Sequence, residues 1–132
     1  MNREILFKAK RIDNGEWVEG QYVYITNPLT EDGKPIKHLI CNGTNIFNDL
    51  IDPVTLCQYT GLTDKNDKKI WENDIVELPD GEGYFTCEWE EDAARFVMNG
   101  DGLTVDFDNY WSYQTEVAGN IFDNPELLEV DR

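Results

Sequence analysis

The chain has few basic residues, a single histidine and no long hydrophobic run. Its 11 Lys and Arg residues stand against 27 Asp and Glu residues, and the formal net charge at pH 7 is −16. A surface of this sign repels phosphate groups and anionic lipids, so we expect no direct contact with nucleic acid or with a membrane. No apolar stretch approaches the about 20 residues that span a bilayer, and the N-terminus lacks the apolar segment of a signal peptide.

Cysteine is also scarce, which argues against a secreted disulfide scaffold. The chain contains Cys41, Cys57 and Cys87, an odd number without a Cys-x-x-Cys pair. Secreted scaffolds have a dense and even set of cysteines, so we expect a reducing, cytoplasmic environment. The apolar residues around Cys57 favour a buried and unreactive thiol.

The length and composition fit one folded domain, which we expect to span residues 1–132. Hydrophobic residues make up 40% of the chain and aromatic residues 12%, which is enough for a core that needs neither a disulfide nor a metal.

Turn signals recur along the chain between short aromatic and β-branched runs, which is typical of antiparallel β structure. The clearest hairpin joins residues 5–10 and 17–25 around Asn14-Gly15. Asn124 followed by Pro125 predicts a short helical turn at the end of the chain, and residues 45–50 are a second candidate. The other turn signals are Asp32-Gly33, Asn42-Gly43, Asp80-Gly81 and Asn99-Gly100, and the other expected strands are residues 38–41, 70–78, 83–89, 95–98, 103–107 and 116–122.

The most distinctive segment is residues 58–76, which read QYTGLTDKNDKKIWENDIV. An extended piece meets a bend at Gly61, where a side chain would hinder the backbone. A polar turn follows at residues 64–67, then a strand that starts at Ile70, and then a tight corner at residues 72–74. This pattern is similar to the opening of small SH3-like barrels. We therefore predict a mainly β fold of antiparallel strands, with a small SH3-like barrel formed by the central and C-terminal part and few short helical turns.

Three blocks of the chain resemble the YopX family of phage and prophage proteins. They are residues 3–9 (REILFKA), residues 58–76, and residues 116–128 (EVAGNIFDNPELL), in the order in which the family has them. Asp67 and Asn73 stand where the family usually has glycine. Because Asp and Asn tolerate a positive φ better than other side chains, we expect both turns to be preserved. The family's usual isoleucine and arginine are replaced by Ala118 and Lys8.

The resemblance implies a phage or prophage origin, a bacterial host cytoplasm and a mainly β fold. It supplies no catalytic residues to carry over. We interpret the residues that match the family motifs as structural; they are Gln58, Tyr59, Thr60, Gly61, Asp64, Ile70, Trp71, Asp74, Ile75, Gly119, Asn120 and Pro125.

The residues form no recognisable metal, cofactor or catalytic motif. Asp64 and Asn66 have the spacing of the first two ligands in a calcium loop, but lysines at 68 and 69 and Ile75 occupy later positions of that loop. We therefore interpret residues 64–69 as a solvated turn. His38 has no second imidazole or cysteine pair nearby, which favours an ordinary strand residue. We expect no metal, no cofactor and no catalytic residue.

Negative charge concentrates in residues 81–132, which carry 13 acidic and 2 basic residues, a net −11. This region contains a possible acidic interaction face that bears Trp89 or Trp111. The pattern favours the other interpretation, a solvated hairpin tip with its tryptophan packed inward. The acidic residues of the face are Glu88, Glu90, Glu91, Asp92, Asp101, Asp106 and Asp108.

Three functional hypotheses follow. The leading one is a phage or prophage accessory protein that acts by protein–protein contact or by self-assembly as a homo-oligomer, with no catalysis inferred. The first alternative is a DNA mimic, in which the acidic region occupies a basic host nucleic-acid-binding protein. The second is a small enzyme whose carboxylate site is assembled with Tyr59, Trp71 or Trp111.

Overall fold

The computed structural model describes residues 5–29, 35–41, 49–78, 83–100, 103–107 and 112–128. The chain divides into two compact units, residues 1–58 (unit 1) and residues 59–132 (unit 2). The single domain expected over residues 1–132 stays a prediction. The turns at Asp32-Gly33, Asn42-Gly43 and Asp80-Gly81 lie outside the described residues.

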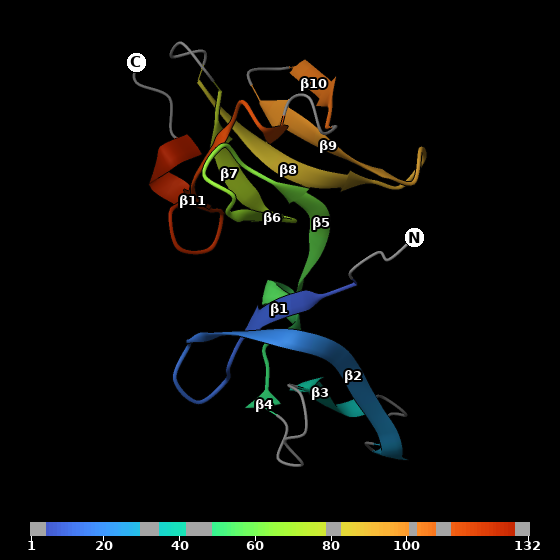
Figure 1. Ribbon diagram of the computed structural model, residues 1–132. Coiled ribbons are helices and arrows are strands. Elements are labelled where there is room, and N and C mark those ends of the chain that lie inside the picture. The colour runs from blue at the N-terminus through green and yellow to red at the C-terminus, as the bar shows by residue number, and fades with distance from the viewer. Residues whose placement is uncertain are drawn as a thin grey trace. The chain divides into compact units, whose positions relative to one another are not determined.

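Unit 1 is built on the predicted first hairpin, which is confirmed. Strand β1 (Phe7–Lys10) pairs antiparallel with β2 (Trp17–Leu29), with Phe7 opposite Gly20. Gly15 closes the turn with φ +73°, a conformation that glycine adopts without strain. Strand β3 (Pro35–Cys41) pairs with β2, and β4 (Asp49–Leu50) pairs with β3. Figure 1 shows β2 as a strand that is longer than the sequence predicted.

The core of unit 1 is small and apolar. Ala9, Ile40 and Ile51 are buried there, with partly buried side chains around them. Next to it lies the 3-10 turn η1 (Pro53–Thr55), which the sequence did not predict. The hydroxyl of Thr55 accepts a 2.8 Å hydrogen bond from the Lys10 amide and so joins η1 to β1. The helical turn expected at residues 45–50 is wrong at Asp49–Leu50, which form β4, and its other residues lie outside the described part.

Strand β5 (Cys57–Thr63) has residues in both units. In unit 1, Cys57 and Gln58 pair with β1. In unit 2, Tyr59 and Thr63 pair with β6 (Lys69–Trp71), and the register shifts between them. Gly61 lies within this shift at φ +89°, and a Cβ atom added to it would meet no other atom within 4 Å. The requirement for glycine is therefore conformational, as predicted, and not a matter of space.

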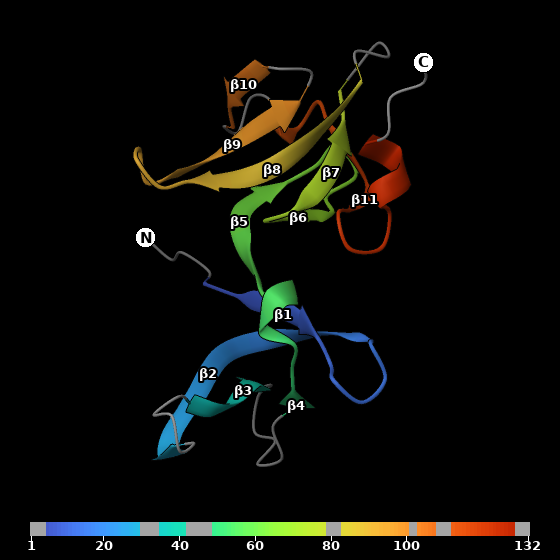
Figure 2. The same ribbon diagram turned by 180° about the vertical axis from the view of Figure 1, so that it is seen from behind.

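Unit 2 contains an antiparallel sheet in the order β10-β9-β8-β7-β11. Figures 1 and 2 show β7, β8, β9 and β10 side by side from opposite directions. After β11 the chain forms the predicted helical turn η3, the red coil that follows Asn124. The elements of unit 2 named here are β7 (Asp74–Glu77), β8 (Tyr84–Glu90), β9 (Arg95–Gly100), β10 (Leu103–Asp106), β11 (Glu116–Asn120) and η3 (Pro125–Leu128).

The strand expected at residues 70–78 is interrupted at the predicted corner, which separates β6 from β7. Among the described strands, no pairing joins β10 to β11, so the sheet of unit 2 is open in this part of the chain. The mainly β fold with few helical turns is confirmed, whereas the small SH3-like barrel is not.

Among the described residues, the core of unit 2 has more buried members than that of unit 1 and mixes aliphatic, aromatic and sulfur-containing side chains. Cys87 is fully buried in it, and the expected burial of Cys57 is also found. No helix in the described residues has the length and the apolar character that a membrane span requires. The buried residues of this core are Ile70, Val76, Leu78, Phe85, Cys87 and Met98, with Phe96, Val105, Phe107 and Val117 packed against them.

Candidate functional site

The turn after β5 is organised by a buried carboxylate. Asp64 is 1% exposed, and its Oδ1 accepts hydrogen bonds from the amides of Asn66 (2.8 Å) and Lys68 (2.9 Å). Its Oδ2 accepts a 2.9 Å bond from the amide of Val117 in β11, 53 positions later. The turn was expected to be solvated, and residues 65–68 are indeed exposed. The expectation is wrong for Asp64, because three backbone amides stabilise its carboxylate inside the protein.

The environment of Asp64 also determines its ionisation. Burial raises the pKa of this carboxyl group, but the amides of Val117, Lys68 and Asn66 and the charge of Lys68 lower it by more, so the net pKa lies below the ordinary value. Asp64 is therefore ionised at neutral pH, and both of its oxygens are engaged by the backbone. Within the described ranges, no group of three or more His, Cys, Asp or Glu side chains is placed to hold a metal ion.

The other central motif residues lie in or near the core of unit 2. The Thr60 hydroxyl donates a 2.7 Å bond to the carbonyl of Ile70 across the β5–β6 pair. Tyr59 and Trp71 are buried and face each other with ring centroids 5.5 Å apart. The Oδ2 of buried Asp74 accepts a 2.8 Å bond from the Trp71 amide and so stabilises the corner between β6 and β7.

The two family glycine positions adopt the backbone conformation that the resemblance led us to expect. Asp67 has φ +62° and Asn73 has φ +72°. Both values lie in the left-handed region, where Asp and Asn are the most common residues after glycine. Both turns are thus preserved despite the substitutions.

The C-terminal motif is a local network around Asn124. A side chain at Gly119 would collide with that of Asn124, whose Cγ would lie 2.6 Å from the new carbon atom. The Asn124 Oδ1 accepts a 3.3 Å bond from the amide of Asn120, and the Asn120 Oδ1 accepts 2.9 Å bonds from the amides of Phe122 and Asp123. The remaining motif residues are half-buried Gln58, fully buried Ile70 and Ile75, and exposed Pro125 at the start of η3.

The structure brings part of the predicted acidic face together. Arg95 links two of its members, because its Nε donates to Glu90 (3.1 Å) and its NH1 to Asp106 (2.7 Å). We call residues 88–95, at the end of β8 and the start of β9, the acidic hairpin. Glu88, Glu90, Glu91 and Asp92 belong to it, Asp106 lies on the neighbouring β10, and Asp101, Asp108 and Trp111 lie outside the described residues.

Trp89 is the aromatic residue of the acidic hairpin. Its side chain packs against Phe96 with ring centroids 5.0 Å apart at 69°, while the residue remains 40% exposed. Its indole Nε1 donates a 3.1 Å bond to Glu91. The neighbouring Phe96 and Glu91 both restrain the ring, so a partly exposed indole is presented next to carboxylates.

A hollow of 400 Å³ lies in unit 2 beside this hairpin. We call it the unit 2 hollow. It is formed where β8 continues past the β6–β7 corner, next to the chain that follows β11 and to the end of η3. Of its lining residues, Glu88 and Trp89 belong to the predicted acidic face, and most of the others come from separate parts of the sequence. The lining residues are Glu72, Asn73, Thr86, Glu88, Trp89, Ile121 and Leu128.

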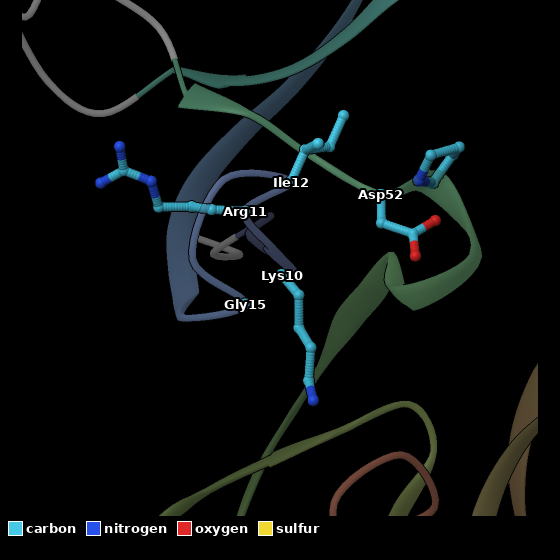
Figure 3. A pocket seen from close by; sticks show the side chains of 6 residues that line it. Lys10, Arg11, Ile12, Gly15 and Asp52 are labelled. Atoms are coloured by element: carbon cyan, nitrogen blue, oxygen red, sulfur yellow. The ribbon is translucent and has the colours of Figure 1, made fainter.

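A second hollow, of 330 Å³, lies in unit 1 and is lined by Lys10, Arg11, Ile12, Gly15, Asp52 and Pro53. Figure 3 shows the side chains of Lys10 and Arg11 pointing in different directions. Arg11 forms a 3.0 Å ion pair with Asp13, and the Lys10 Nζ lies 5.5 Å from the ring centroid of Trp17. The two cations therefore do not converge on one point, as an anion site would require.

The single histidine is part of the sheet of unit 1. The Nδ1 of His38 lies 2.7 Å from the hydroxyl of Tyr22, and the two rings are stacked at 6.0 Å. Cys57 donates from its thiol to the carbonyl of Thr55 at 3.2 Å. The contacts of His38 are within the sheet, and the thiol of Cys57 bonds the end of η1.

Two antiparallel sheets, short helical turns and an acidic hairpin define a mainly β protein with a candidate interaction surface. The family model described as YopX protein matches residues 6–129, and the chain belongs to the YopX family. It is similar to the crystal structure of protein EF1440 from Enterococcus faecalis, with a TM-score of 0.60 and 22% sequence identity over 97% of this chain and 100% of that chain. This similarity supports the fold alone. No curated protein matches the chain.

Proposed function

We propose that this YopX-family protein is a non-catalytic phage or prophage accessory protein that acts by protein–protein contact in the cytoplasm of its bacterial host. The observation that carries the proposal is the position of Trp89, which is 40% exposed and hydrogen-bonded to Glu91 on the acidic hairpin. Partly exposed tryptophans held in place by their neighbours are among the most frequent energetic centres of protein interfaces. A restrained indole also loses little conformational entropy when a partner covers it.

Charge indicates what kind of partner this surface fits. Unit 2 carries 19 acidic and 5 basic residues, a net −14, whereas unit 1 carries 8 and 6, a net −2. A field of this sign accelerates the approach of a cationic protein surface and makes association sensitive to salt. We therefore propose a partner with a basic contact surface.

The DNA-mimic alternative is supported less well by the described residues. A mimic of the DNA backbone presents a series of like charges, but Arg95 lies between Glu90 and Asp106 and is bonded to both. The alternation of charge at this point fits a protein interface, in which ion pairs set specificity. Asp64 does not support the enzyme alternative, because both oxygens of this buried carboxylate accept hydrogen bonds from backbone amides.

Self-assembly is supported by a separate observation in unit 1. Ile12 is 65% exposed and Val54 76% exposed, and the amide of Ile12 donates to the carbonyl of exposed Leu50. Exposed apolar side chains are a common feature of contacts between copies. Light scattering across a range of concentrations tests self-assembly, and a monomeric mass at every concentration would refute it.

The proposed contact is tested by affinity capture with the whole protein and two matched variants, Trp89→Ala and Tyr113→Ala. Tyr113 is an exposed aromatic residue of unit 2 outside the acidic hairpin, so it controls for loss of aromatic surface. We expect a host protein with a basic surface to be retained by the wild type and by Tyr113→Ala, to be lost with Trp89→Ala, and to bind less at high salt. Capture that Trp89→Ala leaves unchanged would refute the role of the hairpin. Recovery of a nucleic-acid-binding protein that DNA displaces would favour the mimic instead.

A further inference from the structure

We infer that the unit 2 hollow is a binding site for an arginine side chain of the partner protein. This inference rests on the proposed function, because it names the group that the acidic surface receives. Two carboxylate residues line the hollow, Glu72 and Glu88, and none of its lining residues is Lys or Arg. A cationic side chain is the complement of such a lining.

The buried polar lining supports a hydrogen-bonding ligand independently of charge. Thr86 is only 7% exposed, yet its side chain has no hydrogen bond with another described residue. None of the fully buried side-chain oxygens in the described residues lacks a partner, so this hydroxyl must retain contact with solvent. Phe85 and Cys87 point into the core of unit 2, so strand alternation places the Thr86 side chain on the opposite face of β8, where Thr86 lines the hollow. A buried hydroxyl without a protein partner is stabilised by a ligand that donates a hydrogen bond to it.

The apolar part of the lining favours arginine among cationic groups. Ile121 and Leu128 offer aliphatic surface against which a long methylene stem can pack. A guanidinium is also more weakly hydrated than an ammonium, so it loses less when it leaves water for such a lining. A guanidinium also donates in several directions from one plane and can therefore serve two carboxylates and a hydroxyl together, unlike the compact ammonium of lysine. The volume of 400 Å³ lies in the range of small-ligand pockets.

The test is a titration of the whole protein with L-argininamide, followed by amide chemical shifts. The matched probe is L-citrullinamide, which has nearly the same shape but an uncharged urea group. We expect saturable shifts that centre on the lining residues with argininamide, at least fivefold weaker binding of citrullinamide, and no comparable shifts around Lys10 and Arg11 in unit 1.

Variants separate the site from the overall charge. We expect the double variant Glu72→Gln with Glu88→Gln to weaken argininamide binding at least fivefold. The control, Glu16→Gln with Glu19→Gln, changes the net charge equally on exposed positions of unit 1 and should leave binding within twofold. Thr86→Val keeps the shape of the side chain and should weaken binding about threefold by removing the hydroxyl acceptor.

Equal binding of citrullinamide, or equal weakening by the two double variants, would overturn the inference. These outcomes are distinct from failure of the proposed function, which depends on capture of a partner through Trp89. A partner that still requires Trp89 but is insensitive to Glu72→Gln with Glu88→Gln would leave the protein contact standing and remove the arginine site.

Discussion

The two units of this protein hold their turns in different ways. In unit 1, the turn between β1 and β2 is closed by backbone bonds, from Gly15 to the carbonyl of Arg11 and from Arg11 to that of Glu16, and by the exposed side chain of Asn14, which accepts from the Glu16 amide. In unit 2, two turns also depend on buried carboxylates: Asp64 receives the amides of Asn66, Lys68 and Val117, and Asp74 receives the amide of Trp71. A turn closed by the backbone tolerates many side chains, whereas a turn closed by a buried carboxylate depends on one residue.

This difference changes how the charge of the chain should be interpreted. Unit 2 is the more acidic unit, but some of its carboxylates are structural and buried, as Asp64 and Asp74 show. Others, such as Glu91 and Asp92, are exposed on the acidic hairpin. Net charge alone therefore overstates the charge that a partner meets. Substitutions at buried and at exposed carboxylates should therefore differ in their effect on stability.

The largest effect is expected from Asp64→Asn. The asparagine has one acceptor oxygen and places an amide donor against a backbone N–H, so at least one of the amides of Asn66, Lys68 and Val117 loses its partner inside the protein. We expect a loss of about 3 kcal/mol or more in the free energy of unfolding, measured by urea titration. Glu126→Gln, an exposed change in unit 2, serves as the control and should shift it by less than about 0.5 kcal/mol.

Hydrogen exchange on the same variant tests the comparison itself. If the units open separately, Asp64→Asn lowers the protection of amides in β7 and β11 and leaves β1 and β2 unchanged. An equal loss of protection in both units would mean that they unfold cooperatively, as the single domain predicted from the sequence requires.

Gly119→Ala should have the second-largest effect. The new methyl group would lie against the Asn124 side chain, which itself bonds the amide of Asn120. We expect a cost of about 1–3 kcal/mol. The double variant with Asn124→Ala separates crowding from the lost hydrogen bond: its cost should be less than the sum of the two single changes. A strictly additive pair would show that Gly119 is needed for another reason.

The pH dependence of stability should carry the signature of Asp64. Its pKa is lower in the folded protein than in the unfolded chain, so its carboxylate adds stability above the unfolded value, about 3.9. This contribution is lost as the pH falls through the folded pKa. We therefore expect the stability advantage of the wild type over Asp64→Asn to be constant near neutral pH and to shrink under acid. An advantage that does not change with pH would contradict the assignment.

The smallest effect is expected at the turn that contains Asp67. Its φ of +62° suits glycine, but glycine also gains freedom in the unfolded chain, so Asp67→Gly should change stability by less than about 1 kcal/mol. Asp67→Val places a β-branched residue in the left-handed region and should cost about 1–2 kcal/mol. Thermal unfolding of the two variants measures the difference, and equal midpoints would contradict it.

Local features of the fold were predictable because short-range chemistry determines them. Asn14-Gly15 indicated the first hairpin, the β-branched and aromatic alternation of residues 103–107 indicated a strand, and Asn124-Pro125 indicated the final helical turn. The two-residue β4 escaped prediction because a segment so short has no periodicity. The pairing of β11 with β7 also could not be predicted, since it joins segments about 40 positions apart.

The candidate site could be predicted only where its residues are close together in the sequence. The acidic residues of the hairpin are close together in the sequence and were identified from it. The unit 2 hollow was not, because Glu72, Thr86 and Ile121 meet only after three separate segments are in place. The burial of Asp64 could not be predicted for the same reason. Its distant partner is the backbone amide of Val117, which no residue type in the sequence identifies.

The bond between Asp64 and Val117 also has a consequence for synthesis on the ribosome. The described strand pairs of unit 1 use residues no later than Gln58, so they can form while the C-terminal half is still being translated. Asp64 must wait for a partner 53 positions further along, and β7 must wait for β11. A nascent chain that stops before residue 117 therefore carries a charged side chain with an incomplete set of donors.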